Sequence, residues 1–317
     1  MKNQILGLHH VTAISGEPQK TLDFYAGILG LRLVKKTVNF DDPGTYHLYF
    51  GNEEGSPGSI MTFFPWGLSG LKGRIGTGQV STTSFSIPDG ATAFWIEKLK
   101  THNIEFDGPQ SRFDEDVLML RDPDGLQLEL VASDKDDRLS WKNGPVPEKY
   151  AIRGFYHVAL SVEESEGTAA LVTETLGCSK LDELDNRFRY AVGEGGAGKL
   201  MDILRQPNEA PGRMGVGAVH HVAWRTSTEA SQLELRQKLV DKGNHVTPVL
   251  DRNYFRSIYF REPGQILFEI ATDPPGFTLD ESKENLGRDL KLPTWLEQRR
   301  EEIEKRLPVL LVPESQD

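Results

Sequence analysis

Two histidine pairs, each followed by valine, stand far apart in the chain and offer ligands for a metal. They are His9-His10-Val11 and His220-His221-Val222. Side chains alternate between the two faces of a strand, so His10 and His221 take equivalent positions if these phrases open equivalent strands. Glu269 ends a later apolar segment and adds a carboxylate. Two imidazoles and one carboxylate on one side of a metal leave open positions opposite, which suits non-haem Fe(II) oxygen chemistry.

A second ligand set remains open. Tyr156-His157-Val158 is a weaker echo of the histidine phrase, and Glu129 ends an earlier segment as Glu269 ends the later one. His157, His221 and Glu269 would also make two imidazoles and a carboxylate. We prefer His10 because it matches His221 through the whole His-His-Val phrase, whereas His157 follows a tyrosine.

The elements that must position these residues recur about every 70 residues, which indicates copies of one unit. Each copy opens with a short strand, continues into a helix and closes with two or three strands. The predicted units are residues 7–65, 78–132, 152–204 and 217–272. The predicted helices are residues 17–29, with Ser15 as N-cap, and 91–101, 167–176 and 228–242. We therefore expect an α+β fold of four βαβββ units arranged as two curved-sheet modules.

Two closing hairpins agree in sequence. The segment Arg121-Asp122-Pro123 and the segment Arg261-Glu262-Pro263 share arginine, an acid and proline, and each is followed at the same distance by Glu129 or Glu269. Pro and Gly stand where a turn needs them. Because the matched histidine phrases belong to units one and four, we predict that these two units share one cavity.

The repeats divide the chain into two halves and a tail. Residues 1–133 hold units one and two, the polar stretch 134–151 is a linker, and residues 152–273 hold units three and four. The tail, residues 274–317, contains a predicted helix over 294–306 whose apolar residues favour packing on the body.

Composition excludes several classes of protein. The net charge of -11 argues against a nucleic-acid binder, which needs a basic surface. Cys178 is the only cysteine, so no intrachain disulfide forms and a reducing compartment is expected. The N-terminus lacks the apolar stretch of a signal peptide, and no run is long enough to span a membrane. We expect a cytoplasmic protein, and homo-oligomer formation stays open.

With these motifs together, the chain resembles the glyoxalase/bleomycin-resistance/extradiol dioxygenase superfamily, the vicinal-oxygen-chelate fold, over residues 5–275. Within it, the chain is most similar to ring-cleaving dioxygenases that act on hydroquinones. The resemblance implies iron ligands from units one and four, which fall on His10, His221 and Glu269. It also implies functional positions close to the metal, which fall on His9, Thr12, His220, Arg252 and Tyr259.

The resemblance implies an extradiol-type hydroquinone ring-cleaving dioxygenase that uses Fe(II), or another divalent metal such as Mn(II), with O2 and a small aromatic diol as reactants. Tyr259 could hydrogen-bond the substrate hydroxyl or the bound oxygen. The alternative is that Tyr259 is an aromatic residue of the hairpin packed in the core. Arg252 could stabilise the anionic charge that develops in the reaction. The alternative is that Arg252 is a solvent-exposed cation on a loop. Strict alternation puts His9 and His220 on the face opposite their neighbours, so their role requires a bend in each strand.

Two rival functions share the fold. A glyoxalase-like isomerase usually needs a second Glu on the closing strand of unit one, and residues 59–64 contain no carboxylate. A non-catalytic small-molecule binding protein would need no metal and would leave the His/His/Glu set without a purpose. Aromatic residues near the ends of the units, Phe63, Phe64, Trp66 and Trp224, would suit an aromatic pocket, although each alone is more typical of the core.

Overall fold

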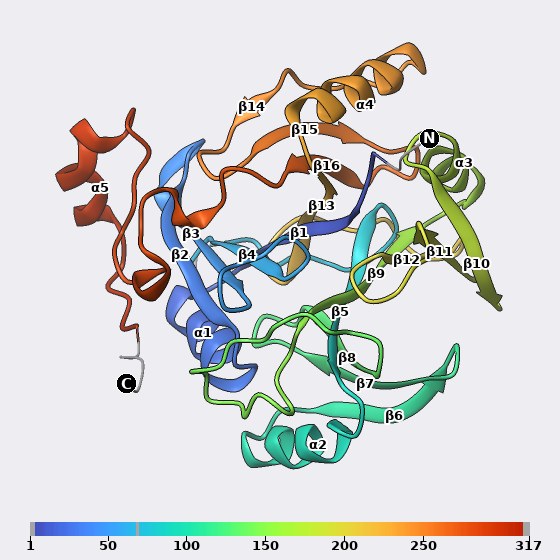
Figure 1. The fold of residues 1–317 in the computed structure, drawn as a ribbon, viewed down its shortest axis with the longest axis horizontal. Helices are drawn as coiled ribbons and strands as arrows, with labels where there is room; N and C mark the ends of the chain where they lie inside the picture. The colour runs from blue at the N-terminus through green and yellow to red at the C-terminus, as the bar shows by residue number, and fades with distance from the viewer. Residues whose placement is uncertain (1–3, 68–69, 313–317) are drawn as a thin grey trace.

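The computed structural model describes residues 4–67 and 70–312, and its strands form two curved eight-stranded sheets. The first sheet has the order β14-β15-β16-β13-β1-β4-β3-β2, and the second has the order β10-β11-β12-β9-β5-β8-β7-β6. Figure 1 shows the blue and orange ends of the chain together in the first sheet and the green and yellow middle in the second. The sheets therefore combine units one and four, and units two and three.

Each unit has the expected βαβββ order. Unit one contains β1 (Gly7–Ser15), α1 (Pro18–Leu22), the π-helix η1 (Asp23–Ile28), β2 (Arg32–Asn39), β3 (Asp42–Gly51) and β4 (Ile60–Pro65). Unit two contains β5 (Gln79–Pro88), α2 (Thr92–Thr101), β6 (Phe106–Arg112), β7 (Glu115–Arg121) and β8 (Gln127–Ser133). Unit three contains β9 (Gly154–Val162), α3 (Glu166–Glu174), β10 (Cys178–Leu184), β11 (Arg187–Val192) and β12 (Leu200–Arg205). Unit four contains β13 (Ala218–Thr226), α4 (Glu229–Asp241), β14 (Leu250–Asp251), β15 (Arg256–Arg261) and β16 (Leu267–Thr272). The predicted α+β fold of four such units in two curved sheets is confirmed.

The local sequence patterns located only two of the three closing strands in each unit, so one strand per unit had no predicted position. These strands, β2, β6, β10 and β14, are the four edge strands of the two sheets. The strand β14 is only two residues long, and β6 and β10 carry the charged and polar residues that edge strands use against pairing with other chains, so their apolar alternation is weak. The residues of β10 are exposed after Cys178, which shows this directly.

Units one and four join through β1 and β13, which pair antiparallel along their length. Thr12 lies opposite His221, and His10 lies opposite Ala223. The register shifts between Leu8 and His10 and between Thr12 and Ala13, so His9 on one strand and His220 on the other lie at bulges. The predicted association of units one and four is confirmed, with both histidine phrases at the seam.

The first helix begins later than predicted. Its N-cap is Glu17 and Pro18 occupies the first helical turn, a position that suits the missing N–H of proline. Ser15 is buried as the last residue of β1, so its predicted role as N-cap is wrong. In unit four, Thr228 does cap its helix, because its side chain accepts a hydrogen bond from Ser231 N.

The hairpins shared by units two and four use their common acid in the same way. Asp122 Oδ1 accepts the backbone N–H groups of Asp124 and Leu126, at 2.9 and 2.8 Å. Glu262 accepts the N–H groups of Gly264 and Ile266, at 2.8 and 2.9 Å. The repeated acid therefore satisfies the buried donors of the turn that leads to Glu129 or Glu269.

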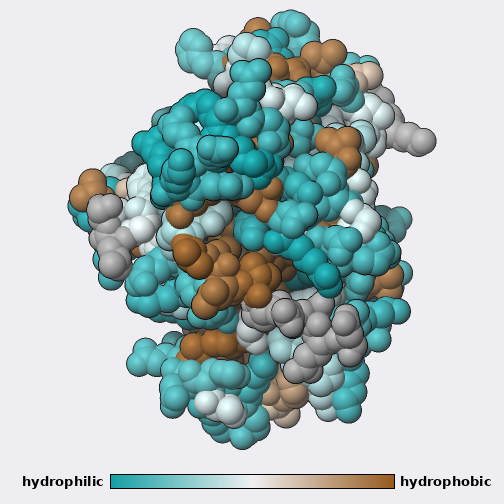
Figure 2. Space-filling model, turned by 90° about the vertical axis from the view of Figure 1, so that its left-hand side faces the viewer, coloured by the Kyte–Doolittle hydropathy of each residue, from teal (hydrophilic) through white to brown (hydrophobic). Residues whose placement is uncertain are grey.

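The tail closes the hollow of the first sheet. Phe277 and Leu286 pack with Tyr49, Ile60 and Ala223 on the face that carries His10. The predicted helix over 294–306 forms as η4 (Glu297–Arg299) and α5 (Arg300–Arg306), and Ile303 packs against Val38 on the body. Figure 2 shows hydrophobic residues gathered in the middle of this side of the molecule, bordered by hydrophilic ones.

The segment between β8 and β9 ties the two sheets together. Arg138 donates to the carbonyl of Gly58 in unit one at 3.0 Å and to that of Phe155 in unit three at 2.6 Å. Asp136 holds the same guanidinium at 2.7 Å. Among residues 4–67 and 70–312, no helix combines the length and the apolar character needed to cross a bilayer.

Candidate metal centre

Three side chains converge in the hollow of the first sheet. His10 Nε2 lies 3.2 Å from His221 Nε2 and 3.2 Å from Glu269 Oε2. His221 Nε2 lies 2.9 Å from the same carboxylate oxygen. Within the described ranges, this is the only group of three or more His, Cys, Asp or Glu side chains whose ligand atoms all approach within 4.8 Å. The structure thus brings together the preferred set of predicted ligands.

Three adjacent strands, β1, β13 and β16, supply these side chains. Ala223 lies beside His10 on one side and Glu269 on the other, so its small side chain leaves room between them. His221 is two residues before Ala223 and therefore points to the same face. His157, in contrast, lies on β9 in the second sheet, so the alternative set with His221 and Glu269 does not assemble.

The surroundings of Glu269 fit a bound cation. The carboxylate is fully buried, and the Ser257 hydroxyl donates to its Oε1. Its Oε2 receives no hydrogen bond of good geometry from any described residue, although both imidazoles face it. Burial opposes its ionisation, yet the nearby His10 and His221 hold the pKa of Glu269 well below its usual range. An anionic oxygen facing two imidazole nitrogens matches what a divalent metal requires.

The bulges turn His9 and His220 toward their neighbours. His9 Nδ1 lies 2.9 Å from His10 Nδ1, and His220 Nδ1 lies 2.7 Å from His221 Nδ1. Each candidate ligand is therefore held at Nδ1, which leaves Nε2 to face the centre, as a second hydrogen bond does for metal-binding histidines generally. Burial lowers the pKa of His220 to about 3, and the pKa of His9 is also well below its usual range, so both rings are neutral.

Tyr259 and Arg252 lie together at the edge of the centre. The rings of Tyr259 and His221 have centroids 5.7 Å apart, edge to face. Arg252 donates from Nε to the Tyr259 hydroxyl at 3.1 Å and from Nη1 to Asp41 at 3.2 Å. Burial raises the pKa of Tyr259, so the phenol keeps its proton and can donate it in a hydrogen bond.

Thr12 faces the same hollow and contacts a second threonine there. Its Oγ1 lies 3.0 Å from Thr62 Oγ1, which in turn lies 2.7 Å from His47 Nε2. Sequence reasoning did not identify Thr62, His47 or Ser257. Alternation along strands β3, β4 and β15 places all three on the concave face, but nothing in their local sequence separates them from ordinary strand residues.

Two of the four aromatic residues proposed for a pocket belong to the core instead. Phe63 and Trp224 are fully buried in the main hydrophobic cluster, and Trp66 is 40% exposed. Only Phe64 lies near the centre, with ring centroids 4.3 Å from His47 and 5.8 Å from His220. Phe255 contributes an unpredicted aromatic face, 5.0 Å from the ring of His10.

The second sheet carries a counterpart of the centre that an arginine fills. His157 corresponds in register to His10, Glu129 to Glu269, and Thr82 to His221. Arg112 donates to both oxygens of Glu129, at 2.9 and 2.7 Å, and its Nη2 lies 3.3 Å from His157 Nε2. The guanidinium thus supplies the positive charge that a metal would bring to these two groups.

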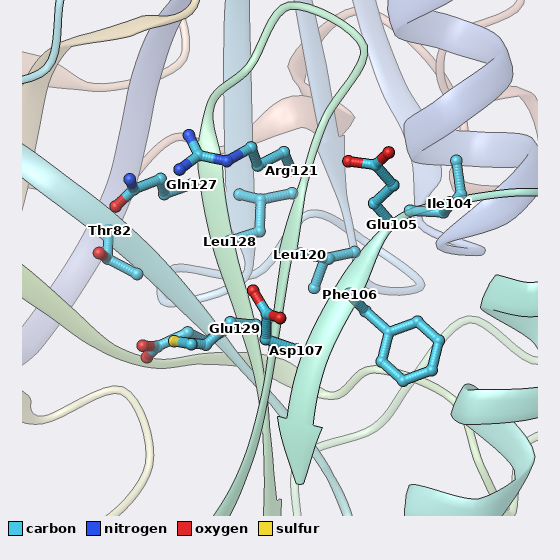
Figure 3. Close-up of a pocket in the computed structure, with 11 residues that line it drawn as sticks. Thr82, Ile104, Glu105, Phe106, Asp107, Leu120, Arg121, Gln127, Leu128 and Glu129 are labelled. Atoms are coloured by element: carbon cyan, nitrogen blue, oxygen red, sulfur yellow. The ribbon is translucent and has the colours of Figure 1, made fainter. Parts of the chain in front are cut away.

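Further ion pairs neutralise the rest of this counterpart. Asp202 lies 3.7 Å from His157 and accepts hydrogen bonds from Arg187 and Arg189, each at 2.8 Å. A cavity of about 580 Å³ opens beside it, and Glu129, Arg121 and Asp107 are among the residues that line it. Figure 3 shows Glu129, Arg121 and Asp107 on the strands that line this cavity. This cavity therefore lies away from the His/His/Glu centre.

Comparison with known proteins agrees with the fold. The profile of the Glyoxalase/Bleomycin resistance protein/Dioxygenase superfamily matches residues 7–130 and 154–278. The "Putative ring-cleaving dioxygenase MhqO" of Bacillus subtilis is 47% identical over 307 residues, 97% of each chain. The chlorohydroquinone/hydroquinone 1,2-dioxygenase of Sphingobium indicum is 35% identical over 311 residues, 96% of each chain.

Solved structures show the same relation. A crystal structure titled as a putative dioxygenase from Bacillus subtilis superposes with a TM-score of 0.94 at 47% identity, and the match covers 98% of this chain and 99% of that one. Glyoxalase I from Zea mays, at 17% identity, has a TM-score of 0.62 over 84% of this chain and 92% of its own, which shows a shared fold alone. The chain belongs to the Glyoxalase/Bleomycin resistance protein/Dioxygenase superfamily.

Proposed function

We propose that the protein is an Fe(II)-dependent dioxygenase that opens the ring of a hydroquinone-type diol with O2. The observation that carries this proposal is the convergence of His10, His221 and Glu269 in one buried centre. Relatives described as ring-cleaving dioxygenases, one of them acting on hydroquinones, support the same reaction class. For a para-diol, the bond cleaved would join the hydroxyl-bearing carbon to its neighbour.

In this proposal, His10, His221 and Glu269 hold the metal. When bound, the metal would collect substrate and O2 on its open side, lower the pKa of the substrate hydroxyl and pass electron density from the ring to oxygen. The protein supplies two neutral donors and one anion, which reduces the net charge of the site. His9 and His220 hold the ligand rings through Nδ1 and so fix their orientation.

Tyr259 and Arg252 would act on the reacting groups. The Tyr259 hydroxyl lies beside His221 and keeps its proton, so it can donate a hydrogen bond to a substrate hydroxyl or to O2. Arg252 orients that hydroxyl from 3.1 Å and adds positive charge where anionic charge develops. Asp41 fixes the other side of the guanidinium.

The structure favours the dioxygenase over the isomerase. The closing strand of unit one, β4, carries Ile60, Thr62 and Phe64 toward the hollow and no carboxylate. Thr62 stands beside Thr12, where a fourth protein ligand would have to reach the centre. Three ligands leave more positions open for two reactants than four do.

Metal analysis combined with oxygen uptake tests the proposal. After anaerobic loading with Fe(II), and in parallel with Mn(II), we expect one metal per chain and oxygen consumption with hydroquinones. Glu269→Ala and His221→Ala should lose the metal and the activity, whereas His157→Ala should keep one metal because its imidazole lies in the second sheet.

Two results would reject the assignment. Full activity in Glu269→Ala would exclude it as a ligand, and loss of metal in His157→Ala with retention in His10→Ala would move the site. Circular dichroism of each variant separates loss of metal from loss of fold, and His245→Ala, at an exposed loop position, serves as the control.

A further inference from the structure

The cavity beside Glu129, in the second sheet, has no part in the reaction proposed above. Its volume of about 580 Å³ compares with roughly 300–1,000 Å³ for small-molecule sites. On β8, Gln127 and Glu129 share one face of the sheet, since side chains alternate along a strand. Figure 3 shows the polar ends of Gln127, Glu129 and Thr82 on the same side of the strands that line the cavity. The cavity therefore has a polar wall on the face that carries Glu129.

Thr82 adds a buried hydroxyl to this wall. The residue lines the cavity and is only 8% exposed. Among residues 4–67 and 70–312, no group forms a hydrogen bond with its side chain. Buried hydroxyls in native proteins normally have a hydrogen-bond partner, because an unpaired one is unfavourable. A molecule bound in the cavity would supply that partner.

Glu129 adds a buried acceptor to the same wall. Its side chain is almost fully buried, and from the described residues its Oε1 accepts one hydrogen bond, from Arg112 Nη1 at 2.9 Å. Burial opposes its ionisation, yet His157 and Arg112 hold the pKa of Glu129 well below its usual range. A carboxylate oxygen accepts two hydrogen bonds, so Oε1 has room for one more donor.

The charges around the cavity leave one negative charge without compensation. Three carboxylates line it, those of Glu105, Asp107 and Glu129. Arg112 binds Glu129 with two hydrogen bonds, and Arg121 lies opposite Glu105 when the register of β6 and β7 is continued by one residue. Asp107 remains, and no cation in the described part of the chain forms an ion pair with it. A ligand with one positive charge complements this arrangement.

Apolar residues make up most of the rest of the lining. They are Ile104, Phe106, Met119, Leu120 and Leu128. Such a surface favours contact with an apolar body, which removes it from water. A hydrated inorganic cation would leave the apolar part of the lining uncovered. The lining therefore fits a molecule that joins an apolar body to one positive group.

We propose that this cavity is a second binding site, for a small organic cation with one ammonium group on an apolar body. An ammonium carries three N–H donors, and Asp107, Glu129 and Thr82 each offer it an acceptor. Asp107 supplies the opposite charge, and the apolar body covers the apolar lining. The site is separate from the His/His/Glu centre, because its residues belong to the second sheet.

Calorimetry at pH 7 with three probes of similar size tests the proposal. Benzylamine, benzyl alcohol and benzoate place an ammonium, a hydroxyl or a carboxylate on the same aromatic body. Benzylamine should bind the wild type about 10-fold more tightly than benzyl alcohol, the scale of a hydrogen bond between charged groups. Benzoate should bind most weakly, because its charge has the sign of Asp107.

Two variants and a matched control locate the binding. Asp107→Asn changes an exposed residue, so the fold should persist, and it should weaken benzylamine about 5-fold, the scale of a partly exposed ion pair. Benzyl alcohol should bind this variant as it binds the wild type. Thr82→Val, nearly isosteric, should weaken benzylamine about 3-fold through loss of one acceptor. Asp116→Asn removes the same charge from an exposed position of β7 outside the lining and should change nothing.

Three results would overturn the proposal. The first is benzyl alcohol or benzoate binding as tightly as benzylamine, and the second is equal weakening in Asp107→Asn and Asp116→Asn. The third is loss of benzylamine binding in folded His221→Ala, which would place the amine at the His/His/Glu centre; wild-type affinity is expected there. None of these measurements depends on oxygen consumption, so failure of the dioxygenase proposal would leave them valid.

Discussion

At the scale of single residues, the centre combines buried ligands with neutral supports. The charge of Glu269 is kept in a fully buried position by two imidazoles and by Ser257. His9 and His220 add polar contacts without adding charge, because burial keeps both neutral. Protonated groups at the same positions would compete with a cation for Glu269. The residues around the centre thus favour metal binding, because they keep Glu269 anionic and place no competing positive charge beside it.

Tyr259→Phe should lower kcat of ring cleavage about 100-fold, as expected for loss of one donor aimed at developing charge. Metal content should not change, because Tyr259 is not among the converging ligand atoms. Steady-state oxygen uptake measures the effect, and Tyr190→Phe, in the second sheet, is the matched control. A higher KM alone, with kcat unchanged, would contradict a role in the reaction.

At the scale of elements, two bulges and two turns position the site. The bulges at His9 and His220 let neighbouring residues of one strand face one centre, which strict alternation forbids. The turn acids Asp122 and Glu262 fix the hairpins that end in Glu129 and Glu269. Since each acid is buried, its ionisation affects the stability of the hairpin.

Asp122 should make stability depend on pH. Burial raises its pKa from 3.8 to about 6, so the folded state binds a proton more tightly than the unfolded state. Its contribution is therefore lost as pH rises from about 4 to about 6, by about 3 kcal/mol. Urea unfolding at pH 4 and pH 7 should show the free energy of unfolding of the wild type falling by this amount relative to Asp122→Asn. A difference that is constant with pH would contradict the prediction.

At the scale of the whole molecule, one fold carries two unlike hollows. The tail packs Phe277 and Leu286 into the first, which holds the centre. The second has a cavity of about 580 Å³ beside it, and its buried acids are neutralised by Arg112, Arg187 and Arg189. Duplicated units have thus kept their backbone while their buried charges diverged, and one metal per chain is expected.

A second metal site should form when Arg112 is removed and the missing imidazole is restored. Arg112→Ala alone leaves the buried Glu129 uncompensated and should destabilise the fold by about 3–5 kcal/mol. Thr82→His combined with Arg112→Ala should bind two metals per chain, and added metal should raise its melting temperature by mass action. Metal analysis after dialysis measures the ratio, and Thr82→His with Arg112 intact, the control, should bind one. A ratio of one in the double variant would contradict the equivalence of the two sites.

The sequence alone determined the repeat, the superfamily and the set of candidate ligands. It could do so because duplicated strands keep the same residue at the same register, so His10 and His221 remain recognisable across about 200 residues. Their role as metal ligands stays a prediction, as do those of Tyr259 and Arg252. The turn acids were visible for the same reason.

Only the tertiary structure decided the rest. The edge strands β6 and β10 were not located because their polar residues hide the strand period. His47 meets Thr62, and Arg112 meets Glu129, through pairing between strands whose local sequences carry no record of the partner. The bulges that turn His9 and His220 inward arise from the pairing of β1 with β13, so the alternation of either strand read by itself places both residues on the wrong face.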